Sequence, residues 1–217
     1  MANNLENELV AKIDPASGVY SEALPGSELL GDKEIRYWLK GRLSAAWPAP
    51  RAVLEELRVY NGNAIADVVA VHRDSHCYEI KSDKDSIERI QKQAHYYDPV
   101  FRKVTLVTTS KHLQRAEILA PPHWGIIVAS PIKGKVVFSH VRPVGLNPHF
   151  NKQLALLTLW RSELTDLAEP ISEIKLAKMN RQNLTELLAN NYSAEKISEQ
   201  ISKQLSGRIQ NLKSFTI

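Results

Sequence analysis

Two acidic residues and one lysine have the types and the spacing that metal-assisted hydrolysis requires. Asp67 lies inside the apolar run at residues 66–71, and Glu79 and Lys81 lie two residues apart in the next apolar run. An ionised carboxylate inside a buried strand is costly unless it is paired or bound to a cation. Asp67 therefore needs a partner.

The register of the hairpin decides whether these three side chains meet. Residues two apart in a strand point to the same face, so Glu79 and Lys81 share one face. Opposed residues in an antiparallel pair have a constant sum of numbers, and an even sum places Asp67 on that face as well. Two registers meet this condition, namely Val71 opposite Ser75 and His72 opposite His76.

Converging carboxylates suggest a particular chemistry. Asp67 and Glu79 would repel each other, and either protonation of one or capture of a hard divalent cation relieves the repulsion. Such a cation polarises a phosphoryl oxygen and lowers the pKa of a bound water, while the Lys81 ammonium orients that water or stabilises charge on phosphorus. The set predicts phosphodiester hydrolysis with Mg²⁺ or Mn²⁺.

The elements around these residues predict an α/β fold. A helix with Asp32 as its N-cap is expected to bury Ile35, Leu39 and Leu43 and to end before Pro48. Strands are expected at residues 53–60, 64–71, 77–83, 102–109 and 124–130, followed by a hairpin-like segment at 131–141, and further helices at 87–97 and 111–119. An Asn61-Gly62 turn is expected between the first two strands.

Three regions are predicted along the chain. Residues 1–30 are rich in turn-forming Pro and Gly and form an irregular leader, and residues 31–148 form the α/β core. Residues 149–217 form an all-helical extension, because only helical spacing occurs after Pro148. The last helix has an apolar stripe, from Ile197 to Leu212, that needs another surface to pack on. A separate module and a fold back over the sheet both remain open.

The same residues carry a resemblance to a known superfamily. Asp67, eleven intervening residues and Glu79-Ile80-Lys81 resemble the signature of the PD-(D/E)xK nucleases, and the order helix, three strands, helix, strand resembles their restriction-endonuclease-like core. The resemblance implies that Asp67 and Glu79 bind Mg²⁺ together with the backbone carbonyl of Ile80. It also implies that Lys81 is catalytic. No proline precedes Asp67, which departs from the signature.

Two further residues enter through this resemblance. Many members have a glutamate on the first helix, for which Glu34 is the candidate, and Gln93 begins a Gln-x-x-x-Tyr element like that of the RecB-like branch. Residues 31–109 and the helical tail also resemble a bacterial and phage group within this superfamily. Each of these residues also has a simpler interpretation. Glu34 would only complement the helix dipole, Gln93 would be solvated, and Tyr97 would be part of the core.

Composition narrows the class of protein. The 217 residues are 43% hydrophobic and 24% charged, as in globular proteins, and Cys77 is the single cysteine. A single cysteine permits no internal disulfide, which suits a reducing compartment. The sequence shows no signal peptide or membrane span, so we expect a cytoplasmic protein. The histidines lack ligand spacing, so we expect no zinc site.

Positive charge is concentrated in the middle of the chain. Residues 100–161 contain nine Lys and Arg residues and one acid, Glu117. This segment is either an ordinary solvated surface or a flank that faces a polyanion. The favoured function is a Mg²⁺-dependent nuclease acting on DNA. The alternative is a catalytically inactive nuclease-fold protein that binds a regulatory protein partner, or itself, through the C-terminal helices.

Overall fold

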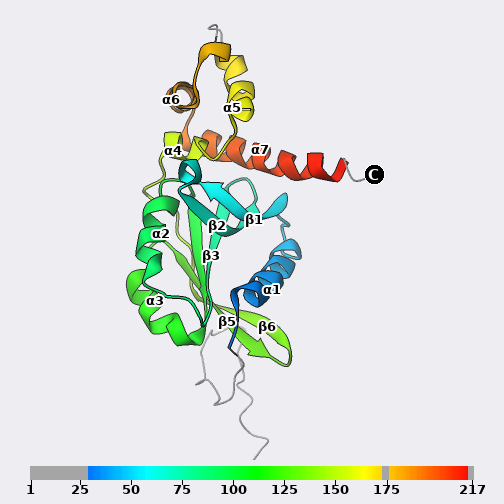
Figure 1. Ribbon diagram of the computed structural model, residues 1–217, viewed down its shortest axis with the longest axis vertical. Coiled ribbons are helices and arrows are strands. Elements are labelled where there is room, and N and C mark those ends of the chain that lie inside the picture. The colour runs from blue at the N-terminus through cyan, green and yellow to red at the C-terminus, as the bar shows by residue number, and fades with distance from the viewer. Residues whose placement is uncertain (1–28, 173–175, 215–217) are drawn as a thin grey trace, which may run out of the picture.

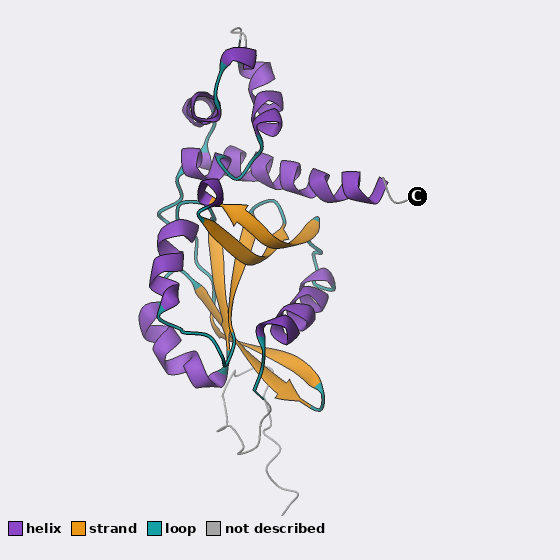
Figure 2. Cartoon of the chain, in the orientation of Figure 1, coloured by secondary structure: helices purple, strands orange, loops and turns teal. Residues whose placement is uncertain are grey.

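A computed structural model describes residues 29–172 and 176–214 of the chain. It shows an α/β structure, in which one six-stranded mixed sheet carries helices on both faces and a helical region follows (Figure 1, Figure 2). The strands are β1 (Ala52–Val59), β2 (Ala64–Val71), β3 (Ser75–Lys81), β4 (Lys103–Thr108), β5 (Gly125–Ile132) and β6 (Lys135–Arg142). The α-helices are α1 (Asp32–Ser44), α2 (Arg89–Tyr97), α3 (Leu113–Leu119), α4 (Lys152–Leu156), α5 (Arg161–Ala168), α6 (Arg181–Asn191) and α7 (Ala194–Ser214). Short 3₁₀ segments are η1 (Tyr60–Gly62), η2 (Ser110–His112), η3 (Glu169–Ile171) and η4 (Leu176–Lys178).

The strands lie in the sheet in the order in which they occur in the chain. β1, β2 and β3 form an antiparallel meander, β3, β4 and β5 are parallel, and β6 returns antiparallel to β5. The parallel connections pass through α2 and α3, as crossovers between parallel strands require. The predicted order of helix, three strands, helix and strand is therefore present from α1 to β4.

Helix α1 covers one face of the sheet. Its buried residues, four positions apart, are Ile35, Leu39 and Leu43. They pack in one apolar cluster with Val68 and Ala70 of β2. Gly31, not Asp32, is the N-cap residue, and no side chain caps the helix. The N-cap prediction is wrong because the Asp32 side chain instead accepts hydrogen bonds from Arg36, one turn further on.

The opposite face carries the larger core. Figure 1 shows α2 and α3 on the side of the sheet away from α1, with α7 crossing the end of the sheet at β1 and β2. One apolar cluster joins β2, β3 and α2 to residues of α4, α5, α6 and α7. Ile197, Ile201 and Leu205 of α7 are buried in it. The Ser75 and Ser202 hydroxyl oxygens lie 3.0 Å apart and join β3 to α7.

This packing resolves the question that the sequence left open. Helix α7 packs against β1, β2 and β3 and shares their core, so the protein's own strands cover Ile197, Ile201 and Leu205, whereas α5 and α6 lie beyond the end of the sheet (Figure 1). Residues 1–28 of the predicted leader lie outside the described residues.

Candidate active site

The structure brings Asp67, Glu79 and Lys81 to one pocket. Val71 pairs with Ser75 across the β2–β3 hairpin, which is one of the two registers predicted to put the three side chains on one face. Glu79 and Lys81 are only 1% and 3% exposed. The alternating charges of β3 therefore do not mark a solvated strand face.

We call this cavity the acidic pocket. Its volume is about 660 Å³, and its walls come from α1, β1, β2, β3, α2 and the turn between β1 and β2. Its charged lining residues are Asp32, Arg36, Glu56, Asp67, Glu79, Lys81, Asp85, Arg89 and Lys92. Carboxylates and cations from distant parts of the chain thus meet around one space.

Asp67 is held from two directions. The backbone N–H of Ile80 donates to Asp67 Oδ2 at 2.8 Å, and Arg36 Nη2 lies 3.3 Å from Asp67 Oδ1. Arg36 also pairs with Asp32 at 3.0 Å and with Glu56 at 3.2 Å. Glu56 lies opposite Asp67 and has a φ of 51°, a left-handed conformation that is strained for a glutamate. The Ile80 amide and Arg36 therefore position this carboxylate.

Glu79 is held by three donors. Lys81 Nζ lies 2.5 Å from Glu79 Oε1, and the side-chain amide of Gln93 donates to the same oxygen. The Tyr97 hydroxyl lies 2.7 Å from Glu79 Oε2 and also 2.7 Å from the backbone oxygen of Ile65, so it shares one proton between two acceptors. This carboxylate is fixed from α2 and from its own strand.

Burial raises the pKa of two groups in this pocket, the Asp67 carboxyl and the Tyr97 hydroxyl. Burial, followed by the charge of Glu79, raises the pKa of Asp67 from 3.8 to about 7. The Ile80 amide and the Lys81 charge act in the opposite direction and only partly offset these effects. Burial also raises the pKa of the Tyr97 hydroxyl well above its ordinary value, and the Glu79 charge adds to this. Near neutral pH, Asp67 lies close to its titration midpoint.

These donors fit a divalent cation. Carboxylate oxygens of Asp67 and Glu79 and the backbone oxygen of Ile80 are the hard ligands that Mg²⁺ prefers. Burial and the Glu79 charge, which raise the pKa of Asp67, disfavour its ionised form, and a bound cation would favour that form. The side-chain oxygen of Gln93 is buried without a hydrogen-bond partner. Among the described residues, no group of three or more His, Cys, Asp or Glu is placed to hold a metal, so any cation would keep several waters.

The comparisons with known proteins give the family. The model described as Bacteriophage P4 protein cII matches residues 35–216. The chain belongs to the bacteriophage P4 protein cII family. Protein cII of enterobacteria phage P4 is 28% identical over 188 residues, covering 84% of this chain and 69% of that protein. No solved structure matches the chain.

Membership of the cII family corrects the assignment made from the sequence. The assignment to the PD-(D/E)xK superfamily is wrong, because the family model that spans residues 35–216 is that of protein cII. The signature consists of three side chains on one hairpin, and an even register with this spacing can arise in any β-meander. The expected link to phage proteins is confirmed at this coarser level.

In this cII-family chain, Gln93 lines the acidic pocket and Glu34 does not. Gln93 also contacts Glu79, and its catalytic role stays a prediction. Glu34 is exposed on α1 and does not line the pocket, because α1 turns Asp32 and Arg36 toward it instead. Tyr97 is core, at 1% exposure, and also contacts Glu79. The sequence analysis missed Arg36, whose only local signal was an acid four residues earlier.

The basic stretch of the cII-family chain does not line this pocket. Its nine cations are absent from the lining, which takes its positive charge from Arg36, Lys81, Arg89 and Lys92. Several cations of the stretch have structural partners instead: Arg142, Lys152 and Arg161 donate to backbone carbonyls, and Arg102 pairs with acids. The charge of a segment therefore does not locate a site.

Two other expectations concern Cys77 and the membrane. Cys77 is buried in the larger core, where burial raises the pKa of its thiol well above the ordinary value, so it packs as an apolar residue. Within the part of the chain that the structure describes, no helix has the length and hydropathy to cross a membrane.

Proposed function

We propose that this cII-family protein hydrolyses phosphodiester bonds, with DNA as substrate and Mg²⁺ or Mn²⁺ as cofactor. The observation that carries the proposal is the convergence of Asp67, Glu79 and Lys81 in one pocket, where burial and the Glu79 charge raise the pKa of Asp67 to about 7. Perturbed carboxylates in a cleft are typical of catalytic sites.

The residues of the acidic pocket would have separate roles in this reaction. Asp67, Glu79 and the carbonyl of Ile80 would hold the cation, which when bound supplies polarisation of a phosphoryl oxygen. Lys81 would orient a water or stabilise negative charge on the phosphoryl group. Gln93 and Tyr97 hold the Glu79 carboxylate in place from α2.

The rim of the acidic pocket supports a nucleic-acid substrate. Arg89 and Lys92 line it from α2, three residues apart, and both are exposed. Side chains three apart lie on the same face of a helix. Cations in this position would contact phosphates on either side of the bond to be cut. With this arrangement, α1, β1–β3, α2 and β4 would act as a restriction-endonuclease-like core.

Hydrolysis assays test the proposal. Single- and double-stranded DNA and RNA are incubated with Mg²⁺ or Mn²⁺ and with wild type, Asp67→Ala, Lys81→Ala or the control Glu117→Ala, an exposed acid on α3. We expect wild type and the control to cleave DNA, and the two site variants to lose activity by about 10²-fold or more. Equal activity in all four proteins would reject the proposal.

One observation favours a second function without turnover. Glu79 already has the Lys81 ammonium, the Gln93 amide and the Tyr97 hydroxyl as partners, so its charge is balanced with no cation. A site balanced in this way suits an inactive nuclease-like protein that binds a regulatory protein partner. Calorimetry with Mn²⁺ separates the two functions. Binding in wild type that vanishes in Glu79→Ala supports the enzyme, whereas an absence of heat in wild type supports the binding protein.

A further inference from the structure

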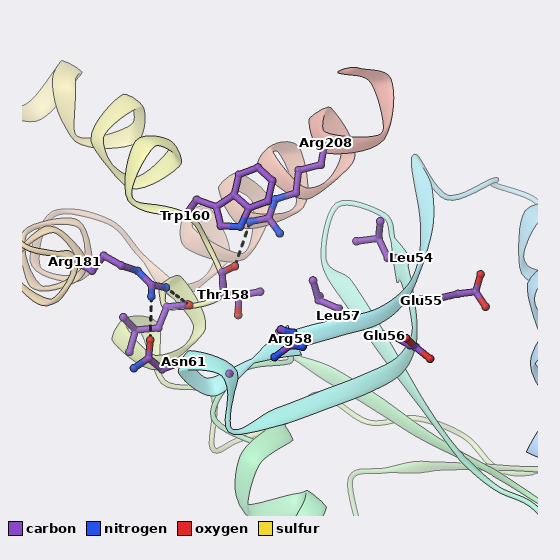
Figure 3. Close-up of a pocket in the computed structure, with 12 residues that line it drawn as sticks. Leu54, Glu55, Glu56, Leu57, Arg58, Asn61, Thr158, Trp160, Arg181 and Arg208 are labelled. Carbon is purple, nitrogen blue, oxygen red and sulfur yellow. Dashed lines mark hydrogen bonds between the residues drawn. The ribbon is translucent and has the colours of Figure 1, made fainter. Parts of the chain in front are cut away.

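A second pocket lies against the helical extension. We call it the arginine pocket; its volume is about 440 Å³, and it is formed by β1, η1, the α4–α5 connection, α6 and α7 (Figure 3). Glu56 and Gly62 line this pocket and the acidic pocket alike, so the two cavities are neighbours. A ligand that extends from one could enter the other.

Arg181 lines this pocket and has no acidic partner among the described residues. Its Nη2 donates to the backbone oxygens of Leu157 at 2.5 Å and Leu159 at 2.9 Å, and its Nη1 donates to the side-chain oxygen of Asn61 at 2.9 Å. Among the described residues, no carboxylate lies within ion-pair distance of Arg181 or of the exposed Arg58. Two positive charges of the pocket are thus uncompensated.

The acids of the pocket are already engaged. Glu55 pairs with Lys40 of α1, and Glu56 pairs with Arg36 at 3.2 Å. Neither therefore neutralises Arg58 or Arg181. The local field in the pocket favours an anion.

Two buried donors in the lining lack partners. The Thr158 hydroxyl and Arg181 Nε are buried and form no hydrogen bond. Thr158 is only 6% exposed, so its hydroxyl is unpartnered inside the protein. Unsatisfied buried polar atoms are rare because each is costly. Both atoms have almost no accessible surface, so they belong to the wall behind the pocket and do not contact a ligand in its open space.

Trp160 adds an aromatic surface beside these donors. It is 60% exposed, and the Arg208 guanidinium lies 4.1 Å from the centre of its ring. Arg208 is fixed in turn by two hydrogen bonds to Glu163, at 2.7 and 2.6 Å. A rigid, exposed indole next to cations is the arrangement on which unpaired bases stack.

We infer that the arginine pocket binds a single nucleic-acid strand, with a phosphate at Arg58 and Arg181 and a base stacked on Trp160. This inference rests on the proposed function, because it names the strand that would enter the neighbouring acidic pocket. Single strands fit better than duplexes, since only an unpaired base exposes its face to a side chain.

Fluorescence anisotropy in EDTA tests strand binding without turnover. The probes are labelled oligonucleotides of about 12 nucleotides, as DNA, as RNA and as DNA duplex. We expect Trp160→Ala to weaken single-strand binding about tenfold, Trp160→Phe to retain most of it, and Arg58→Ala to weaken it several-fold. Trp47→Ala and Arg73→Ala are matched controls, because both residues are exposed and lie outside the two pockets.

The outcomes separate this inference from the proposed function. Normal affinity in both Trp160→Ala and Arg58→Ala would overturn it, as would tighter binding of duplex than of single strands. Strand binding that depends on Trp160 in a protein with no hydrolytic activity would support this inference and reject the proposed function. The DNA and RNA arms show which sugar the pocket prefers.

Discussion

The acidic pocket and the arginine pocket share Glu56 and Gly62 but treat charge in opposite ways. In the acidic pocket, Asp67 and Glu79 are held close enough that the charge of one raises the pKa of the other. In the arginine pocket the acids are paired and two cations are left over. Under the two proposals, the first arrangement would bind a divalent cation for hydrolysis, and the second would hold a nucleic-acid strand. Variants that affect one property and spare the other test this division.

The largest expected effect is on hydrolysis, from Lys81. Lys81→Gln removes the only lysine of the Glu79 network, and we expect the rate to fall about 10²- to 10³-fold while strand binding in EDTA is unchanged. Loss of a buried ion-pair partner also lowers stability, by about 3–5 kcal/mol. Lys81→Arg keeps the charge, so it should restore the melting temperature without restoring the rate. Recovery of the rate in Lys81→Arg would contradict a role for the exact ammonium position.

The second effect concerns stability and its dependence on pH. Because the pKa of Asp67 is raised to about 7 in the folded protein, the unfolded state loses this proton first as pH rises, and the folded state loses stability between about pH 4 and pH 7. Asp67→Asn removes this penalty. We expect the variant to be more stable than wild type at pH 8, by on the order of a few kcal/mol, and equally stable near pH 4.

Urea unfolding at the two pH values measures this difference, and Mn²⁺ sharpens it. Wild type should gain stability from Mn²⁺ at pH 8, whereas Asp67→Asn should not, because a ligand that binds only the folded state stabilises it. A variant that is less stable than wild type at pH 8 would show that the Arg36 ion pair outweighs the burial of Asp67.

The acidic pocket could be predicted further from sequence than the arginine pocket. The period of a strand is two, so any register with an even sum places Asp67 on the face of Glu79 and Lys81, and the sequence offered two such registers. The side of α1 that faces the site was harder to predict. Ile35 had to be buried, but Glu34 and Arg36 flank it on opposite sides. The direction of α1 across the sheet decides which of these two meets Asp67. That direction depends on tertiary packing.

The arginine pocket had no comparable local signal. Its lining comes from β1, from Thr158 and Trp160, and from Arg181 and Arg208 of the last two helices. These segments meet because α7 packs against β1, β2 and β3 and α4 packs against η1. The excess charge of residues 100–161 did not point to this pocket, since its unpaired cations are Arg58 and Arg181, outside that segment. The family could not be predicted from three side chains on a hairpin.

A smaller effect separates positioning from catalysis within the acidic pocket. Tyr97→Phe removes the hydroxyl that lies 2.7 Å from Glu79 Oε2 but keeps the ring in the core. We expect a loss of about 1 kcal/mol in stability and about a tenfold loss in rate, with the Mn²⁺ affinity reduced in proportion. Tyr96→Phe is the matched control, because Tyr96 lines the same pocket and its hydroxyl has no hydrogen bond among the described residues. A change in rate without a change in Mn²⁺ affinity would show that Tyr97 does not act by positioning the Glu79 carboxylate.

The smallest expected effect is on the salt dependence of strand binding, which distinguishes the two pockets most directly. Each phosphate contact in a single strand contributes about 0.7 to the slope of log affinity against log salt concentration. Arg58→Ala should therefore reduce the magnitude of that slope by about 0.7, because its side chain is exposed in the arginine pocket with no carboxylate within ion-pair distance. Lys81→Gln should leave the slope unchanged, since Lys81 is 3% exposed and paired with Glu79. Anisotropy titrations in EDTA at several salt concentrations measure both slopes. An equal reduction in the two variants would mean that the strand's phosphates contact both pockets alike, and the division of charge between them would then have no functional meaning.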